Sequence, residues 1–180
     1  MAAGESLLPP VAKPVAPPLV QQIYQCFSIG ALALASYFVI SHFVMQTVQV
    51  VGQSMVPTLQ DSQQLLLNRW IYLVRAPQRC DVVVPRDPEN NVAVKRIIGM
   101  PGDVVELKDG KVYINTNLLS EPYLNPGTPT FPYTKEPELD KPIKCEKDEY
   151  YVLGDNRKNS ADSRTYGKIT RQQILGLISR

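Results

Sequence analysis

The chain has 180 residues, of which 19 are basic and 17 acidic, so its formal net charge is only +2. This length allows one ordinary domain and a short appendage. A charge this small, with no block of like charges, argues against nucleic acid as a partner. The three cysteines, Cys26, Cys80 and Cys145, match no metal-binding spacing, and we expect neither a metal nor another cofactor. A disulfide between Cys80 and Cys145 stays open, because connectivity cannot be read from sequence.

The N-terminal part of the chain divides into a tail and an apolar stretch. Residues 1–20 contain five prolines, which do not fit the interior of a helix or of a central strand, so we predict a flexible tail. From Tyr24 to Val44 the chain is mostly apolar and carries no charge. Twenty-one residues at about 1.5 Å each reach roughly 31 Å, close to the hydrocarbon thickness of a bilayer. We therefore predict a transmembrane anchor over residues 21–47.

The apolar stretch has two other interpretations. A buried core helix of a soluble protein has a similar composition. A cleaved signal peptide would need a basic segment before the apolar residues and a clear small-residue cleavage site, and both are missing here.

Residues 48–180 have the composition of a β domain. Short runs of β-branched and aromatic residues alternate there with Gly, Pro, Asn and Asp, which is typical of a mostly β, antiparallel fold. Asp109 and Gly110 between two apolar runs indicate a tight hairpin. Prolines crowd residues 119–144, which predicts a long loop or insert rather than a strand. Strands are expected at residues 47–51, 64–68, 81–84, 91–98, 103–107, 111–114 and 149–153.

A short aromatic and aliphatic patch occupies residues 70–73. Exposed apolar patches mark contact sites, and Trp and Tyr favour the membrane interface, so one interpretation is a membrane contact. The other interpretation is a core strand.

Three blocks of sequence in the β region carry candidate chemistry. Residues 50–59 place Ser54 shortly after the apolar stretch, and residues 92–103 place Lys95 among aliphatic residues. Residues 154–164 form a dense polar turn that contains Ser160. In this order and spacing, the blocks resemble the type I signal peptidases, the membrane-bound Ser/Lys endopeptidases that remove signal peptides. The resemblance implies a signal-peptidase-like antiparallel β-sheet catalytic domain over residues 48–180.

The residues themselves favour lysine as the catalytic base. A serine hydroxyl is a poor nucleophile until a neighbouring base takes its proton. The only histidine, His42, lies inside the predicted anchor, which argues against a Ser-His-Asp triad. An unperturbed lysine has a pKa near 10.4 and is charged at neutral pH, but complete burial lowers this pKa by up to roughly 3–5 pH units. The apolar neighbours Val94, Ile97 and Ile98 favour such burial of Lys95.

The resemblance also assigns roles to these residues. It implies that Ser54 is the nucleophile, that Lys95 is the general base, and that the backbone N–H of Ser54 donates to the oxyanion. Many bacterial relatives add a serine hydroxyl two positions before the nucleophile; Gly52 stands there in this chain, so the second oxyanion donor stays open. Ser160 matches a second serine whose hydroxyl bonds the lysine amine. Four charged residues match family residues that fasten the polar turn through ion pairs, for which Arg96 is one candidate partner. They are Asp155, Arg157, Asp162 and Arg164.

The same resemblance implies the substrate and the location. Signal peptides of exported preproteins would be cut after small residues at positions −1 and −3, the extended peptide adding as a strand above shallow pockets. The enzyme would be a single-pass protein of the plasma or inner membrane, with its catalytic domain on the extracytoplasmic side. The lack of a basic, serine-rich transit peptide favours a bacterial over an organellar membrane. Residues that match the −1 pocket region are Met55, Leu59, Ala93 and Val94, with Val48 and Val50 toward −3, although each also fits a β core.

Two other classes of protein explain part of the pattern. Self-cleaving repressors also use Ser and Lys, but they need a DNA-reading helix-turn-helix upstream, where this chain has prolines and an apolar span. A catalytically silent, membrane-anchored binding module would share the anchor and the β domain. Only the intact Ser54, Lys95 and Ser160 argue against it, and labelling by a serine-reactive inhibitor separates the two classes.

Overall fold

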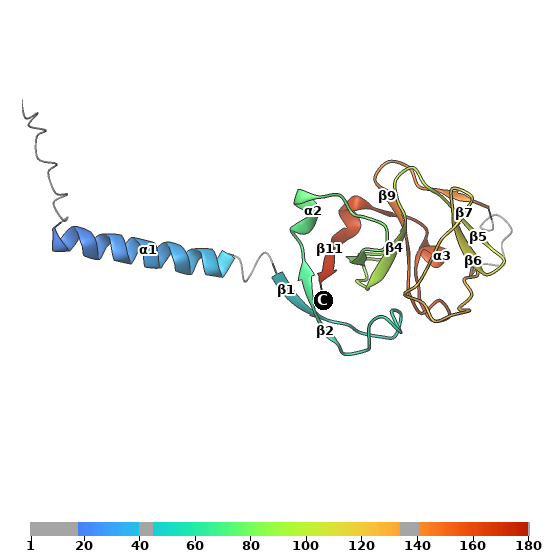
Figure 1. Ribbon diagram of the computed structural model, residues 1–180, viewed down its shortest axis with the longest axis horizontal. Helices are drawn as coiled ribbons and strands as arrows, with labels where there is room; N and C mark the ends of the chain where they lie inside the picture. The colour runs from blue at the N-terminus through green and yellow to red at the C-terminus, as the bar shows by residue number, and fades with distance from the viewer. Residues whose placement is uncertain (1–17, 40–44, 134–140, 180) are drawn as a thin grey trace, which may run out of the picture. The chain divides into compact units, whose positions relative to one another are not determined.

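The computed structural model describes residues 18–39, 45–133 and 141–179 (Figure 1). The chain forms two units, one ending at Val39 and one beginning at residue 40. Most of the predicted tail, and also His42, lie outside the described residues.

In the first unit the structure describes the helix α1, Leu19–Val39. It has 21 residues, none of them charged and none buried, and it is long and apolar enough to cross a membrane. A long, uncharged and mostly apolar helix with no buried residue in its own unit fits a membrane span. The anchor and the alternative of a buried core helix both stay predictions.

The second unit is built from two antiparallel sheets (Figure 1). The larger sheet has seven strands in the order β1-β2-β11-β3-β4-β9-β10, and the smaller has four in the order β7-β6-β5-β8. The fold is mostly β, as predicted. The strands of the larger sheet are β1 Met45–Gln49, β2 Gln64–Asn68, β3 Val82–Pro85, β4 Lys95–Gly99, β9 Glu149–Leu153, β10 Ile169–Thr170 and β11 Ile174–Ser179, and those of the smaller are β5 Val104–Lys108, β6 Lys111–Ile114, β7 Asn117–Leu118 and β8 Ile143–Lys144.

The seven predicted strands are all present, with one substantial change of bounds. The strand expected at residues 91–98 begins only at Lys95, and before it Val92 forms a single bridge to Arg86. The predicted hairpin is confirmed: Asp109 and Gly110 both have positive φ, +52° and +72°, and join β5 to β6. Two successive residues with positive φ are what a tight hairpin turn with native twist requires.

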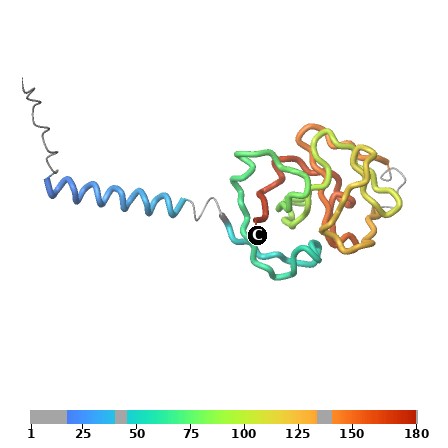
Figure 2. Tube along the Cα trace, viewed as in Figure 1, coloured from blue at the N-terminus to red at the C-terminus, as the bar shows by residue number. Residues whose placement is uncertain are grey.

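The sequence interpretation missed β11, which lies between β2 and β3 in the larger sheet. In Figure 2 this strand is red and runs beside strands coloured cyan to green, because the end of the chain returns to the start of the domain. Its residues alternate between buried and half-buried positions. Gly176 lies at its centre because a side chain there would come within 2.6 Å of the Asn68 carbonyl oxygen and 2.8 Å of Leu67 Cδ1.

The patch at residues 70–73 is not a core strand. Ile71–Val74 form the one-turn helix α2, and the Asn68 side chain accepts hydrogen bonds from the backbone N–H groups of Trp70 and Ile71, both at 3.0 Å. Tyr72 is buried, whereas Leu73 is 75% exposed. Membrane contact by this patch stays a prediction.

The remaining connections agree with the expected loops. Within the described part of residues 119–144, the only strand is β8, at its very end. The other helical turns are α3, Ser163–Tyr166, and a 3₁₀ turn at Arg171–Gln173. All three cysteines are unpaired, so the Cys80–Cys145 disulfide is not formed.

We expect Gly176→Ala to lower the free energy of unfolding by about 1–3 kcal/mol, the usual penalty for forcing an extra methyl into a packed interior. The added carbon meets the backbone of β2, which cannot move aside without breaking the pairing of β11 with β2. Urea unfolding of the full chain in detergent, followed by circular dichroism, measures the change. Gln64→Ala, at an exposed position of β2, is the control and should change stability by less than about 0.5 kcal/mol. Equal stability of Gly176→Ala and wild type would contradict this packing.

Candidate active site

Ser54 lies on a turn that is fixed from two sides. Met55, the next residue, is fully buried in the core. The Ser54 carbonyl oxygen accepts a hydrogen bond of 2.9 Å from the backbone N–H of Asn156. Gly52 adopts a φ of +92°, which favours glycine, and its N–H donates to Asp61 Oδ1 at 2.7 Å. The hydroxyl is therefore presented by a turn with little freedom to move.

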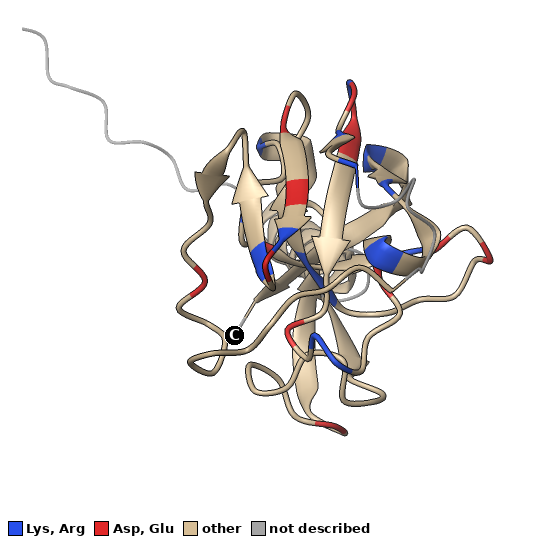
Figure 3. Cartoon of the chain, turned by 90° about the vertical axis from the view of Figure 1, so that its right-hand side faces the viewer, with Lys and Arg blue, Asp and Glu red and all other residues tan. Residues whose placement is uncertain are grey.

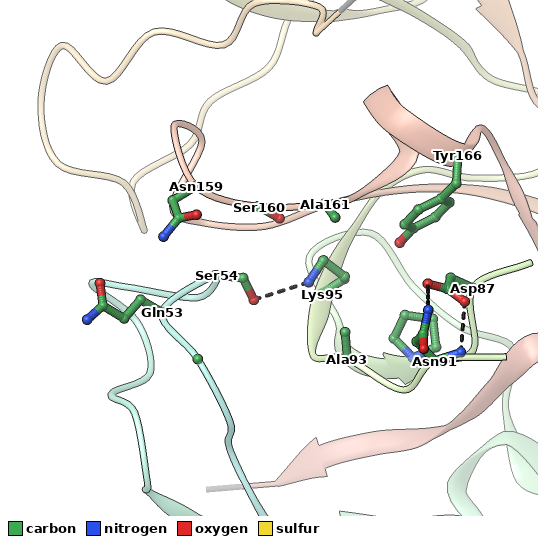
Figure 4. A pocket seen from close by; sticks show the side chains of 12 residues that line it. Gln53, Ser54, Asp87, Asn91, Ala93, Lys95, Asn159, Ser160, Ala161 and Tyr166 are labelled. Carbon is green, nitrogen blue, oxygen red and sulfur yellow. Dashed lines mark hydrogen bonds between the residues drawn. The ribbon is translucent and has the colours of Figure 1, made fainter. Parts of the chain in front are cut away.

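Lys95 brings a buried amine to that hydroxyl. It is the first residue of β4 and is 2% exposed. Its Nζ lies 3.1 Å from Ser54 Oγ and donates to the Val94 carbonyl oxygen at 3.0 Å. Figure 4 shows the two side chains pointing toward each other. Among the described residues, no carboxylate forms an ion pair with this amine.

The surroundings of Lys95 weaken its hold on a proton. Burial lowers its pKa, since a charged amine loses water without gaining a contacting anion. The charge of Asp162 raises the pKa, that of Arg164 lowers it and that of Asp87 raises it, but burial has the largest effect and the resulting pKa is below the ordinary value. A lysine in this state can accept a proton from a neighbouring hydroxyl.

Ser160 lies in the same cavity without the hydrogen bond that was expected of it. Its hydroxyl is buried and has no partner among the described residues, and the Lys95 amine bonds Ser54 and Val94 instead. Gly154 explains how it comes so close: a side chain there would overlap the Ser160 hydroxyl and come within 2.6 Å of the Ser54 carbonyl oxygen. The absence of a side chain at this position lets both serines pack against the end of β9.

Two ion pairs fasten the polar turn, and all four of their residues are buried. Arg96 Nη2 lies 2.6 Å from Asp155 Oδ2, and its Nε donates to Asp155 Oδ1 at 2.9 Å. This pair confirms Arg96 as a partner of the turn. Asp162 binds Arg164 through two hydrogen bonds of 2.7 and 2.8 Å and also accepts from the backbone N–H of Gly154 at 3.0 Å. The turn is therefore held at its start and at its end.

Arg157 joins the turn to the proline-rich loop. Its guanidinium contacts the carboxylate of Glu121 and the hydroxyl of Thr130, and its Nε donates to the Gly154 carbonyl oxygen at 3.1 Å. The Tyr133 hydroxyl donates to the Arg157 carbonyl oxygen at 2.8 Å. In Figure 3 basic and acidic positions are interspersed through the domain, as such local pairs require. Within the described residues, no group of three His, Cys, Asp or Glu side chains could hold a metal ion.

The residues predicted to bind the peptide separate into two groups. Ala93 lines a cavity of about 410 Å³ together with Ser54, Lys95 and Ser160. The other five lie in or against a hydrophobic core that the serine turn shares with β1, β2, β3 and β11. Their contact with a peptide stays a prediction. Those buried in this core are Met55, Leu59 and Val50, and those half-buried against it are Val48 and Val94.

Sequence reasoning missed other residues that line the cavity, among them Asp87, Asn91 and Tyr166. Asp87 and Asn91 lie in the loop between β3 and β4, and Tyr166 ends α3. None of these three residues belongs to one of the three blocks. Only the pairing of β3 with β4 brings this loop beside Lys95, so no local signal could have identified it.

Comparison with known proteins gives a consistent set of relatives. The sequence profile of the family described as "Signal peptidase, peptidase S26" matches residues 23–180. Signal peptidase I of Bacillus amyloliquefaciens is 38% identical over 149 residues, which cover 81% of this chain and 80% of that protein. Signal peptidase IB of Staphylococcus aureus is 36% identical over 159 residues, covering 83% of each. A crystal structure of a signal peptidase I from Enterococcus faecalis V583 is 32% identical with a TM-score of 0.48, covering 58% of this chain and 98% of that chain.

We expect Gly154→Ala to lower kcat for a preprotein substrate by about 100-fold, the scale that a misplacement of about 1 Å produces in a reacting group. The methyl group would displace Ser160, the Ser54 carbonyl, or both. Gly167→Ala is the control: its φ of +81° makes any side chain strained, but the added carbon meets nothing within 4 Å. It should lose stability yet keep kcat within about threefold below its melting temperature. A Gly154→Ala enzyme with wild-type kcat would show that the close packing is not needed.

Proposed function

Because this chain belongs to the signal peptidase family, peptidase S26, we propose that Ser54 and Lys95 form the catalytic dyad with which it cleaves signal peptides. Family membership makes it a serine endopeptidase, a hydrolase that acts on the signal peptides of preproteins. The observation that supports the dyad is the distance of 3.1 Å between the Lys95 amine and the Ser54 hydroxyl. Proton transfer needs a separation of about 2.6–3.2 Å.

The first half of the reaction forms an acyl-enzyme. Ser54 Oγ attacks the carbonyl carbon of the scissile bond while its proton passes to the neutral Lys95 Nζ. The resulting ammonium then gives this proton to the nitrogen of the leaving chain, the C–N bond breaks, and the signal peptide remains as an ester on Ser54. Lys95 is neutral again at the end of this half.

The second half uses the same base on water. Lys95 Nζ takes a proton from a water molecule, whose oxygen attacks the ester carbonyl, and the proton is returned to Ser54 Oγ as the ester bond breaks. We propose that the backbone N–H of Ser54 donates a hydrogen bond to the negative oxygen of both tetrahedral intermediates. Among the described residues, none accepts a hydrogen bond from this N–H, so it is available.

Supporting roles follow from the contacts of the polar turn. Ser160 has a buried hydroxyl in the same cavity, so we propose that it bonds the amine when the dyad changes its protonation state during turnover. Asp155 and Arg157 hold the start of the turn, while Asp162 and Arg164 hold its end. These four act through the position of Ser160 and Ser54 rather than on the substrate.

The choice of substrate is proposed from the shape of the site. Ala93 leaves a small, apolar position beside the dyad, which suits a small residue at −1 of the signal peptide. Selection of a small residue at −3 rests on the resemblance described above. The extended peptide would lie along the cavity wall with its scissile carbonyl over Ser54.

Helix α1 is proposed as a single-pass membrane anchor. Its 21 uncharged residues measure roughly 31 Å, close to the hydrocarbon thickness of a bilayer. We propose the plasma or inner membrane as its location, with residues 48–180 on the extracytoplasmic side, where preproteins emerge. Lys13 is the only basic residue before Arg69, so the orientation rests on the family and not on flanking charge.

Replacing the base tests the dyad. Lys95→Ala should leave a folded protein whose kcat/KM for a preprotein is lower by about 10³-fold or more, since general-base catalysis contributes roughly 10²–10⁴. Lys95→Arg should fail as well, because arginine does not give up its proton. Cleavage of a purified preprotein in detergent, read by gel, measures both, with Ser54→Ala as the inactive reference. Lys158→Ala, an exposed lysine of the polar turn, should cleave normally. Turnover by Lys95→Arg at the wild-type rate would refute the dyad.

The pH dependence tests the protonation state. Only the neutral amine accepts a proton, so kcat/KM should rise with pH and level off above the pKa of Lys95. Because burial lowers this pKa, the rise should be centred below the ordinary lysine value of about 10.4. The measurement needs a substrate without titratable groups beside the scissile bond, and circular dichroism at each pH to confirm folding. A profile centred at or above 10.4 would contradict a buried neutral base.

A further inference from the structure

The cavity that holds the dyad extends past Lys95 to a polar end. Asp87, Asn91 and Tyr166 line this end (Figure 4). Figure 4 shows all three on the side of Lys95 away from Ser54. The reaction proposed above uses none of them.

The Asp87 carboxylate is held in place by one neighbour. The backbone N–H of Asn91 donates to Oδ1 at 2.8 Å, and the Asn91 side-chain amide donates to Oδ2 at 2.9 Å. These bonds lower the pKa of Asp87, with a smaller contribution from the charge of Lys95, so the group is anionic at neutral pH. Each carboxylate oxygen can accept two hydrogen bonds and here accepts one from Asn91, which leaves lone pairs for a ligand.

The Asp87 carboxylate determines the net charge of the cavity. Among the described residues that line it, Asp87 is the only acid and Lys95 the only base. When Lys95 is neutral, as its catalytic role requires, the cavity carries one negative charge from Asp87. The opposite wall adds the Tyr166 hydroxyl, which stays protonated because burial raises the pKa of this tyrosine.

We propose that Asp87 is a specificity-determining residue, which favours a basic substrate side chain at a position beside the scissile bond and rejects an acidic one. The proposal rests on the function assigned to Ser54 and Lys95, which places the scissile bond in the same cavity. A basic side chain reaching the polar end finds a fixed carboxylate, whereas an acidic side chain finds a like charge and no cation while Lys95 is neutral.

A neighbouring acid offers a matched control. Glu89 lies on the same loop, is exposed, and does not line the cavity. It accepts only a long hydrogen bond of 3.4 Å from Asn91. Removing the charge at Glu89 therefore tests the effect of the loop's overall charge on substrate preference. Removing the charge at Asp87 tests the effect of the charge inside the cavity.

The experiment measures kcat/KM for a series of peptides cleaved by the full chain in detergent micelles. One residue at a time, from three before to three after the scissile bond, is Lys, Gln or Glu. At one position we expect wild type to prefer Lys over Glu by about tenfold, the combined size of a partly exposed attraction and a repulsion. Asp87→Asn, which keeps the shape of the side chain, should reduce this ratio to within about twofold. Glu89→Gln should keep the wild-type ratio.

A second measurement uses wild type alone, so it does not depend on how the variants fold. The Lys-over-Glu ratio should fall as NaCl is raised from 0.05 to 1 M, since the cavity is open to solvent and salt screens exposed charges. The proposal is overturned if no position shows a charge preference that Asp87→Asn removes, or if Glu89→Gln changes the ratio equally. Asp87→Asn should still cleave the Gln peptides, unlike Lys95→Ala, so failure of this proposal is distinguishable from failure of the dyad.

Discussion

The burial of one amine without a contacting anion is the constraint on which the rest of the site depends. Lys95 and Arg96 are adjacent on β4, both are buried, and they face different surroundings. Burial acts to lower the pKa of Arg96, but its hydrogen bonds and ion pair with Asp155 outweigh burial and keep the guanidinium charged. Lys95 meets a hydroxyl and a carbonyl oxygen instead. An isolated buried charge costs several kcal/mol, so the amine relieves this cost by giving up its proton.

The polar turn keeps its own ion pairs apart from the uncharged amine of Lys95. Asp162 shows how this is done, since it binds Arg164 and the backbone of Gly154 and so fixes both sides of the segment that carries Ser160. Arg157 extends the same fastening to the proline-rich loop through Glu121. Each buried charge in the turn has a partner, which is what allows a dense group of ions to lie under an uncharged amine. The loop is therefore part of the active site's support and not a surface insertion.

Much of this arrangement was predictable from sequence, and the reasons for the misses are physical. Runs of β-branched residues located most strands, and Asp109-Gly110 fixed a hairpin, because both signals are local. The strand β11 was missed because Gly176 interrupts its apolar run, although the glycine is there to let two backbones approach. The closeness of Ser54 and Lys95 has no local signal at all, since 41 residues separate them. It followed only from resemblance, as did the expected bond from Ser160, which this structure does not form.

A base that is buried must still become charged for a moment in every turnover, and the charge of Asp162 helps to stabilise that state. Asp162 and Asp87 both raise the pKa of Lys95, yet neither forms an ion pair with it. At an effective dielectric constant of 20, a contact at 4 Å would be worth about 4 kcal/mol, which corresponds to roughly three pH units and would act against the effect of burial. Because the energy falls with distance, Asp162, whose side chain binds Arg164 instead, stabilises the transient ammonium without holding it permanently charged. The separation of carboxylate and amine, rather than the presence of a carboxylate, is thus what lets a lysine serve as the base, and it leaves the Asp87 carboxylate to face the substrate.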